Sequence, residues 1–438
     1  MEAQIKKLWA WRLGTAAMLT LGYGAFYICR SNLAVIGAIP EFQGPEGLLD
    51  ETGFGLLGSI GILAYAIGKF FNGVITDYLG GKLIFVTGMA ASIAATILFS
   101  LSSGIIAFAI IWGLNRFVQS GGWAALLKIS AHWFPHQWQG TVMGFISISY
   151  LLGDALTRAF LGYFQQLGFS WQSIFLISAG SFFFVMLLTL AFLRESPRSL
   201  DLPEAEANPE SVYGATGEND HPASFGDLML PLFKSVTFWM VLLMSFGLTF
   251  IRELFSFWSA VLLKNSAASI DASSAIYGSM AFPVGGFVSV LLAGFLSDRL
   301  AHGNRAKIIL PGLILSCLSI LAMAWLQDRH NYWITIGMLF LVALFLIGPY
   351  SFLGAVIALD IGGKQGPASA SGIIDGIGYL GATLSGWGVG IVVNYYGWSA
   401  VYFILGIAIV TSTLASIIYW WRSNRKHQLF LRQSGSGA

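Results

Sequence analysis

The segment "LTLGYGAFYICRSNLAVIGAIP" (residues 19–40) is almost wholly apolar, yet it carries an arginine, Arg30, near its middle. A helix needs about 20 apolar residues to cross the roughly 30 Å hydrocarbon core of a bilayer. Placing an arginine at the centre of such a helix costs about 2.5–3.5 kcal/mol on insertion scales. The position of Arg30 therefore indicates that this arginine has a functional role inside a membrane-spanning segment.

The composition of the whole chain agrees with a membrane location. Of its 438 residues, 56% are hydrophobic and only 10% are charged, whereas soluble domains carry about 25% charged residues. The net charge of +2 is too small to suggest a nucleic-acid partner. Cys29 and Cys317 both lie in apolar runs, so no disulfide framework is indicated. The first run lacks a small-residue cleavage site and is not a removable signal peptide.

Twelve apolar runs of spanning length follow one another along the chain. They cover residues 13–41, 53–76, 82–103, 105–128, 142–166, 172–193, 236–263, 273–297, 305–326, 331–357, 367–393 and 398–421. The acidic segment between the sixth and seventh runs is rich in Pro, Ser, Gly and Ala and reads as a flexible linker. We predict an all-α membrane protein with an N-terminal six-helix half (1–193), a cytoplasmic linker (194–235), a C-terminal six-helix half (236–421) and a tail (422–438).

The distribution of basic residues predicts the orientation. With the N-terminus inside, fifteen of the 23 Lys and Arg residues fall in cytoplasmic segments, two fall on the opposite side, and six lie within spans. Because cytoplasmic loops carry the excess of positive charge, we expect both termini and the linker to be cytoplasmic. A short chain without glycosylation-rich loops suits a bacterial inner membrane.

The two halves repeat a short motif. "GVITDYLGGK" after the second run and "GFLSDRLAHGNRAK" after the eighth place Gly73–Asp77 and Gly294–Asp298 at a separation of 221 residues. Arg30 has a counterpart in Arg252, 222 residues later. Six-helix halves related by an axis along the membrane normal, with substrate bound between them, are one transporter architecture. The loops resemble those of the major facilitator superfamily, which implies gating at the cytoplasmic face by Gly73, Asp77, Lys82, Gly294, Asp298 and Arg299.

The repeated arginines predict the ligand. Arg30 and Arg252 at matching depth would face one cavity, where each guanidinium suits a phosphate or carboxylate bidentately. Since the two cations repel, a doubly charged anion is the natural occupant. The alternative for Arg252 is an ion pair with the adjacent Glu253, although neighbouring side chains on a helix diverge by about 100°.

The segments around these residues resemble the organophosphate:phosphate antiporters. "YICRSNLAVIGAIP", "YAIGKFFNGVITD", "WGLNRFVQSGGWAALLK" and "IRELFSFW" are similar to their first, second, fourth and seventh helices, and "GPYSFLGAVIALDIG" and "GIIDGIGYLGATLSG" to the tenth and eleventh of the sugar-phosphate exchanger branch. The resemblance implies exchange of a phosphorylated metabolite against inorganic phosphate by rocking of the halves. The substrate-binding residues that it and the intramembrane charges indicate are Arg30, Arg252, Lys69, Tyr27, Tyr150, Asn115, Trp123 and Trp258; Tyr150 replaces a histidine of the glycerol-phosphate carriers.

Further charged residues inside the spans leave alternatives open. Asp154 and Arg158 are four apart on one helix face, as a self-neutralising pair or as part of the site. Arg116 either lines the cavity or pairs with Asp154. Candidates for coupling or charge pairing are Asp154, Arg158, Glu253, Asp375 and Arg116.

The sequence shows no sign of an enzyme. Its histidines lack metal-ligand spacing and no phosphate-binding glycine loop is present, so we expect no metal, no cofactor and no ATP-driven step. We expect a monomer in a lipid bilayer that takes a small anionic substrate with inorganic phosphate as counter-substrate. Two alternatives stay open: a proton-coupled importer of a polycarboxylate or metal chelate, suggested by Asp154, Glu253 and Asp375, and a ligand-sensing receptor of the same fold.

Overall fold

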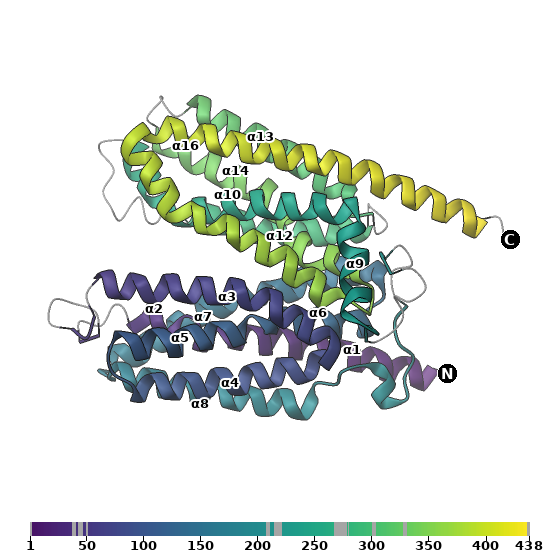
Figure 1. Ribbon diagram of the computed structural model, residues 1–438, viewed down its shortest axis with the longest axis horizontal. Coiled ribbons are helices and arrows are strands. Elements are labelled where there is room, and N and C mark those ends of the chain that lie inside the picture. The colour runs from purple at the N-terminus through teal and green to yellow at the C-terminus, as the bar shows by residue number, and fades with distance from the viewer. Residues whose placement is uncertain are drawn as a thin grey trace.

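The computed structural model of the protein describes residues 2–36, 41–42, 47–49, 51–206, 211–213, 221–266, 278, 280–299, 304–326 and 331–435. Its helices form two bundles that lie side by side (Figure 1). The N-terminal bundle contains α1 (Glu2–Phe26), η1 (Tyr27–Cys29), α2 (Asn32–Ile36), α3 (Glu51–Leu79), α4 (Gly81–Leu101), α5 (Ile105–Gln119), α6 (Gly121–Trp133), η2 (His136–Trp138), α7 (Gln139–Gln166) and α8 (Trp171–Phe192). The C-terminal bundle contains α10 (Val236–Ser266), α12 (Ala281–Arg299), α13 (Ala306–Leu326), α14 (Tyr332–Phe352), η6 (Leu353–Ile357), α15 (Ala358–Gly362) and α16 (Pro367–Gly435).

Each predicted span coincides, in its described part, with a helix or with consecutive helices. Eight described segments are long and apolar enough to cross a membrane. The predicted all-helical membrane fold is confirmed. The eleventh and twelfth predicted spans both lie in α16, which bends at Gly397, where φ is +73°, a backbone conformation that favours glycine.

The first predicted span differs from the expectation of one continuous helix, because it is broken at Arg30. α1 ends at Phe26, and the N–H groups of Arg30 and Ser31 both donate to the carbonyl of Tyr27, at 3.0 and 2.8 Å. The break frees the carbonyl of Cys29, which accepts from the side-chain amides of Asn115 (3.1 Å) and Gln119 (3.0 Å) of α5. Irregular backbone at membrane depth requires such partners, so α5 makes the break possible.

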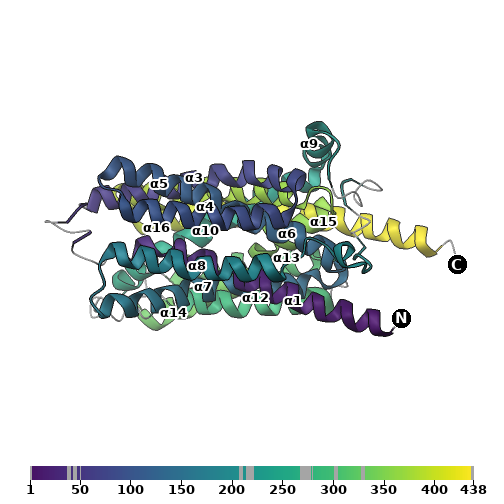
Figure 2. The ribbon, with the colours of Figure 1, turned by 90° about the horizontal axis from the view of Figure 1, so that it is seen from below.

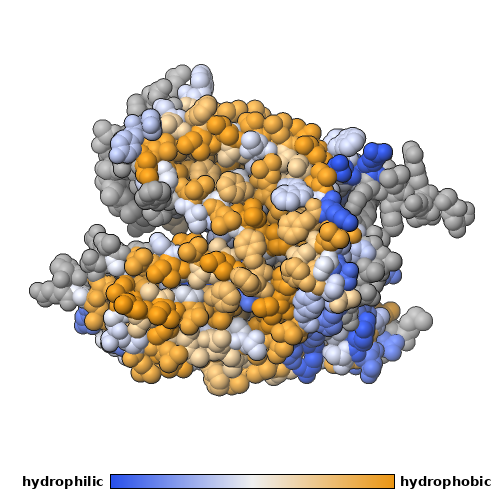
Figure 3. Space-filling view, in the orientation of Figure 1, coloured by the Kyte–Doolittle hydropathy of each residue, from blue (hydrophilic) through white to orange (hydrophobic). Residues whose placement is uncertain are grey.

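The two bundles meet at one end of the molecule and diverge toward the other. They touch at the end that carries both termini, which we call the terminal face (Figure 1). On the face shown in Figure 3, apolar residues cover both bundles and hydrophilic residues gather at the terminal face. The two perpendicular views place α9 (Phe225–Lys234) across the direction of the long helices, at this face (Figure 2).

The segment predicted to be a flexible linker makes specific contacts with both bundles at the terminal face. The N–H of Ala205 donates to the carbonyl of His132 in the N-terminal bundle (3.2 Å), and the N–H of Val212 donates to that of Ile361 in the C-terminal bundle (3.0 Å). Glu204 lies 3.3 Å from the Nζ of Lys364. Burial opposes ionisation of Glu204, but the hydrogen bond and charge of His132 and the charge of Lys364 outweigh it and lower its pKa to about 2. The described linker therefore joins the two bundles.

Candidate functional site

A polar cavity lies between the two bundles. It has a volume of about 90 Å³, room for several water molecules or a small anion. Its lining is Tyr23, Tyr27, Arg30, Tyr65, Lys69, Trp123, Ser147 and Tyr150 from the N-terminal bundle and Arg252, Tyr350, Ser351, Gly354, Asp375 and Tyr379 from the C-terminal bundle. Seven of these residues were predicted from the sequence: Tyr27, Arg30, Lys69, Trp123, Tyr150, Arg252 and Asp375.

Arg30 enters the cavity from the break in the first span. Its guanidinium lies over the rings of Tyr27 and Tyr65, with Cζ 4.6 and 4.8 Å from the ring centroids. Its Nε donates to the Oε1 of Gln119 at 3.0 Å. The same Gln119 also bonds the carbonyl of Cys29, so one amide fixes both the backbone break and the side chain. Within the described part of the chain, the buried Nη2 of Arg30 has no hydrogen-bond partner.

Arg252 of α10 reaches the same cavity with a different environment. It lies over the ring of Tyr350 (4.7 Å) and forms an ion pair with Glu253. The sequence left this pair open as the alternative for Arg252, and the structure contains it even though neighbouring side chains on a helix diverge. Arg252 nevertheless lines the cavity, and its Nε is buried without a hydrogen-bond partner among the described residues.

Lys69 and Asp375 meet across the boundary between the bundles. The Nζ of Lys69 on α3 lies 2.8 Å from the Oδ2 of Asp375 on α16. The lining contains three cations, Lys69, Arg30 and Arg252, and one carboxylate, that of Asp375. Its formal charge is therefore +2. Behind the lining lie one further cation, Arg116, and two further carboxylates, Glu253 and Asp154. A dianion would neutralise the lining itself.

Several tyrosines of the lining were not predicted. Tyr23, Tyr65, Tyr350 and Tyr379 surround the charged groups, together with Ser147 and Ser351. A signal was present for three of them, because each lies one helical turn from a predicted residue: Tyr23 precedes Tyr27 by four, Tyr65 precedes Lys69 by four, and Tyr379 follows Asp375 by four. Tyrosine hydroxyls donate and accept hydrogen bonds, and the rings offer flat apolar faces.

Two residues predicted to bind substrate lie outside the cavity lining. Asn115 is buried behind Arg30, where it bonds the Cys29 carbonyl and accepts from the hydroxyl of Ser92 at 2.7 Å. Trp258 donates from Nε1 to the carbonyl of Ser385 at 2.9 Å and packs against Trp398. Asn115 thus holds the broken backbone behind Arg30, whereas Trp258 joins α10 to α16 through residues that are not part of the lining.

The remaining charged candidates are also placed behind the lining. Arg116 lies over the ring of Tyr65, with Cζ 4.7 Å from its centroid, and near Gln119. Asp154 accepts a hydrogen bond from Ser31, next to the break in the first span. The side chain of its predicted partner Arg158 lies outside the described residues.

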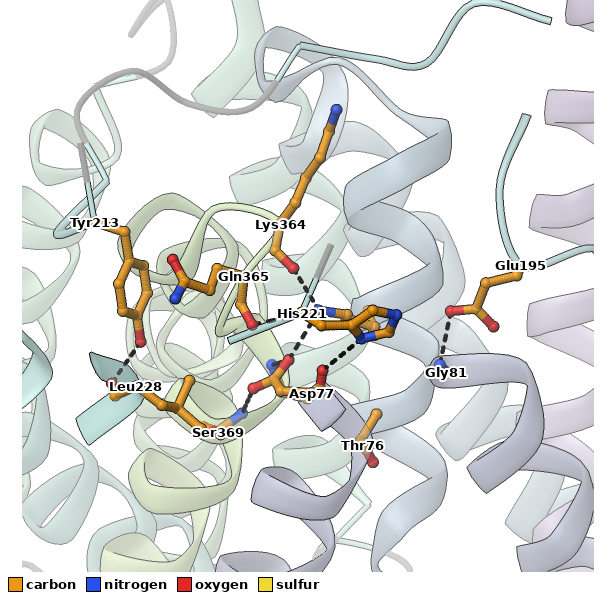
Figure 4. Close-up of polar contacts among 12 residues, drawn as sticks. Thr76, Asp77, Gly81, Glu195, Tyr213, His221, Leu228, Lys364, Gln365 and Ser369 are labelled. Atoms are coloured by element: carbon orange, nitrogen blue, oxygen red, sulfur yellow. Dashed lines mark hydrogen bonds and ion pairs between the residues drawn. The ribbon is translucent and has the colours of Figure 1, made fainter. Parts of the chain in front are cut away.

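The predicted gating residue Asp77 joins the two bundles at the terminal face. Its carboxylate accepts from the N–H groups of Ala368 (3.3 Å) and Ser369 (2.6 Å), at the beginning of α16 (Figure 4). A carboxylate is stabilised there by the free N–H groups and the helix dipole. Lys128 completes the contact, with Nζ 3.4 Å from Asp77 and 2.5 Å from the carbonyl of Lys364. The Asp77 and Lys128 side chains are both fully buried.

The second predicted gating motif, around Gly294 and Arg299, makes different contacts from the first. Gly294 packs against the backbone of Gly140 on α7, where a Cβ would lie 3.0 Å from the carbonyl oxygen. Arg299 lies over the ring of Phe295, and the side chain of Asp298 lies outside the described residues. A polar contact between the bundles is made nearby by Arg305, which donates to the carbonyl of His136 at 2.7 Å. In the first motif, the N–H of Lys82 donates to Glu195 at 2.5 Å within the N-terminal bundle.

Comparison with known proteins gives consistent results. The sequence pattern of the Major Facilitator Superfamily matches residues 16–300 and 265–435. The chain is 27% identical to the "probable hexose phosphate transport protein" of Chlamydia pneumoniae, over 97% of this chain and 94% of that protein. It is 26% identical to the membrane sensor protein UhpC of Escherichia coli, over 92% and 91%. Its fold is similar to that of the transporter FucP in the outward conformation, with a TM-score of 0.67 and 15% identity, over 92% of this chain and 98% of that one.

Proposed function

Because this chain belongs to the Major Facilitator Superfamily and is an integral membrane secondary transporter, we propose that it exchanges a phosphorylated organic anion of sugar-phosphate type for inorganic phosphate. The name of the Chlamydia pneumoniae relative supports this substrate class. The six tyrosines of the cavity suit such a substrate, because their rings can pack against a sugar and their hydroxyls can bond its oxygens.

One observation carries the proposal. The Nη2 of Arg30 is buried without a hydrogen-bond partner in the described structure, and it belongs to a cavity lining with a formal charge of +2. Leaving a buried charged donor unpaired is costly, and a phosphate dianion bound there would supply the missing acceptor. Guanidinium groups match phosphate oxygens with two parallel hydrogen bonds.

The transport cycle follows from the contacts between the bundles. With Asp77 and Arg305 in place, the terminal face is closed. Breaking these contacts and closing the opposite end, by rocking of the halves 1–193 and 236–421, would present the same cavity to the other side. By the distribution of Lys and Arg, we assign the terminal face to the cytoplasm, which places the linker 194–235 and the tail 422–438 there. We further propose a monomer in a bacterial inner membrane.

The test is counterflow in proteoliposomes. Vesicles containing the purified protein and loaded with phosphate should take up labelled hexose 6-phosphate several-fold faster than vesicles loaded with chloride. Arg422→Lys, a change of an exposed arginine in the C-terminal helix, serves as the matched control for arginine substitutions in the cavity. Uptake that ignores internal phosphate and follows an imposed pH gradient would replace exchange with proton coupling.

A second function has one observation in its favour, the similarity to a membrane sensor protein over most of both chains. A sensor would bind phosphate esters without moving them. Binding of hexose 6-phosphate in a thermal-shift assay, together with no counterflow in the same preparation, would favour the sensor.

A further inference from the structure

A continuous line of contacts joins the cavity to the terminal face. We call it the α3–α16 seam: Tyr65, Lys69, Gly73 and Asp77 on α3, and Tyr379, Asp375, Gly372, Ser369 and Ala368 on α16. The α3 residues are four apart and therefore share one face of the helix. The two helices come from different halves, so the seam must open when the halves separate at the terminal face.

The seam has four levels. The rings of Tyr65 and Tyr379 meet edge to face, with centroids 5.5 Å apart. One turn further, Lys69 and Asp375 form their 2.8 Å ion pair. The next level is Gly73 against Gly372 and the Ala368 carbonyl, and the last is the Asp77 carboxylate on the N–H groups of Ala368 and Ser369.

The glycine level makes the seam stiff. A Cβ on Gly73 would lie 2.7 Å from the carbonyl oxygen of Ala368 and 3.2 Å from the Cα of Gly372. The two backbones are thus in direct contact, with no side chain between them to absorb a shift. A change in spacing at the ion pair is therefore transmitted to the beginning of α16, where Asp77 binds, since packed interiors transmit strain.

The ion pair is the level at which the seam meets the cavity. Lys69 and Asp375 both line it, and their side chains are 4% and 20% exposed. An anion bound between Arg30 and Arg252 would lie in the same small cavity as the Lys69 ammonium. Its charge would attract Lys69 and repel Asp375, in surroundings where charge–charge interactions are less screened than in water.

We propose that Asp375 is a tethered counter-anion that competes with substrate for Lys69 and keeps the unloaded carrier closed at the terminal face. Substrate phosphate takes Lys69 from Asp375, the second level of the seam separates, and the terminal face can open. The inference rests on the proposed exchange function and adds a reason for exchange. A carrier that has released its cargo outside rebuilds the ion pair, so its return without a new anion is slow.

The experiment compares net efflux with exchange in the full-length protein. Proteoliposomes loaded with labelled phosphate are diluted either into phosphate-free medium or into medium containing unlabelled phosphate. For Asp375→Asn, we expect the ratio of net efflux to exchange to rise several-fold, because the unloaded carrier no longer holds the seam. Asp201→Asn is the matched control, since it removes an exposed acid of the linker in a left-handed backbone conformation that asparagine also adopts, and it should keep the wild-type ratio.

A labelling measurement keeps the test independent of the variant's folding. Ser369→Cys places a thiol at a fully buried position of the seam. In this protein with the native Asp375, phosphate should increase the rate of maleimide labelling; adding Asp375→Asn should raise the rate without phosphate.

The outcomes separate this inference from the proposed function. Suppose that the wild-type protein exchanges phosphate, but that Asp375→Asn has the wild-type ratio of net efflux to exchange, or that phosphate does not change the labelling rate. Either result overturns the role of Asp375 and leaves the exchange function intact. Wild-type protein that exchanges no phosphate overturns both.

Discussion

Arg30 and Arg252 occupy corresponding places in the two halves, but their surroundings differ. Arg30 is held by a Gln119 side chain and two tyrosine rings, and no carboxylate pairs with it in the described part of the chain. Arg252 shares its charge with Glu253. The N-terminal half thus offers a fixed cation with an open donor, whereas the C-terminal half offers one that must leave an acid to bind a substrate. Repetition of a residue preserves its position in the fold, but not its energetics.

The largest effect is expected from Arg30→Lys. Lysine keeps the charge but loses the planar fork and the contact with Gln119. Because a hydrogen bond to a charged group contributes about 1.5–3 kcal/mol, the Kd for phosphate should rise about 10- to 150-fold. Isothermal titration with phosphate measures this directly, and Arg422→Lys should bind as the wild type does. Unchanged affinity in Arg30→Lys would remove this arginine from the site.

A smaller effect is expected from Arg252→Lys. Since Glu253 already satisfies part of this guanidinium, the substrate gains only the difference between the two partners. We expect the Kd for phosphate to rise about three- to tenfold, which corresponds to about 0.7–1.4 kcal/mol. Isothermal titration with phosphate measures this change in Kd as well. A loss equal to that of Arg30→Lys would show that the two arginines act alike and would erase the asymmetry.

Glu253→Gln tests the asymmetry from the other side. Without the competing carboxylate, Arg252 is free to bind an anion, so the phosphate Kd should fall. The side chain of Glu253 is one-third exposed, and water screens the pair, so we expect only about a two- to fivefold change. Glu206→Gln, at an exposed position of the linker, is the control. Weaker phosphate binding in Glu253→Gln would instead assign Glu253 a supporting role.

The smallest effect is expected from Asn115→Ala, which removes one of the two amides on the Cys29 carbonyl. Gln119 still bonds this carbonyl and still holds Arg30. The phosphate Kd should therefore rise only about twofold, while the thermal midpoint falls, because a buried hydrogen bond contributes about 1 kcal/mol. A large loss of affinity with unchanged thermal stability would return Asn115 to direct substrate contact.

The sequence predicted the helical spans, the repeat and the charged part of the cavity. Polar residues stand out in apolar runs, and their spacing identified Arg30 and Arg252 as counterparts, whereas Lys69 was identified from the family resemblance of its segment. The tyrosines were not, because Tyr65 and Tyr379 resemble any tyrosine in a membrane helix until the helices are placed side by side.

Other features depend on partners distant in sequence. The break at Arg30 has no proline and is stabilised by Asn115 and Gln119, so the local sequence reads as a continuous helix. The linker looked flexible because its composition is polar, but Glu204 is held by Lys364, 160 residues away. The ion pair between Arg252 and Glu253 depends on side-chain rotamers, which helical spacing alone does not specify.

The crosswise helix α9 has a mechanical consequence. A single residue, Ser235, separates it from α10, and its side chains Phe225, Leu230 and Phe233 are exposed at the terminal face. With the terminal face at a bilayer surface, such a helix would lie in the interfacial plane with its apolar side toward the acyl chains. Tilting of the C-terminal bundle would move this helix deeper into one leaflet or out of it. The lateral pressure of that leaflet would then act on the carrier's conformational equilibrium, making turnover sensitive to lipid packing.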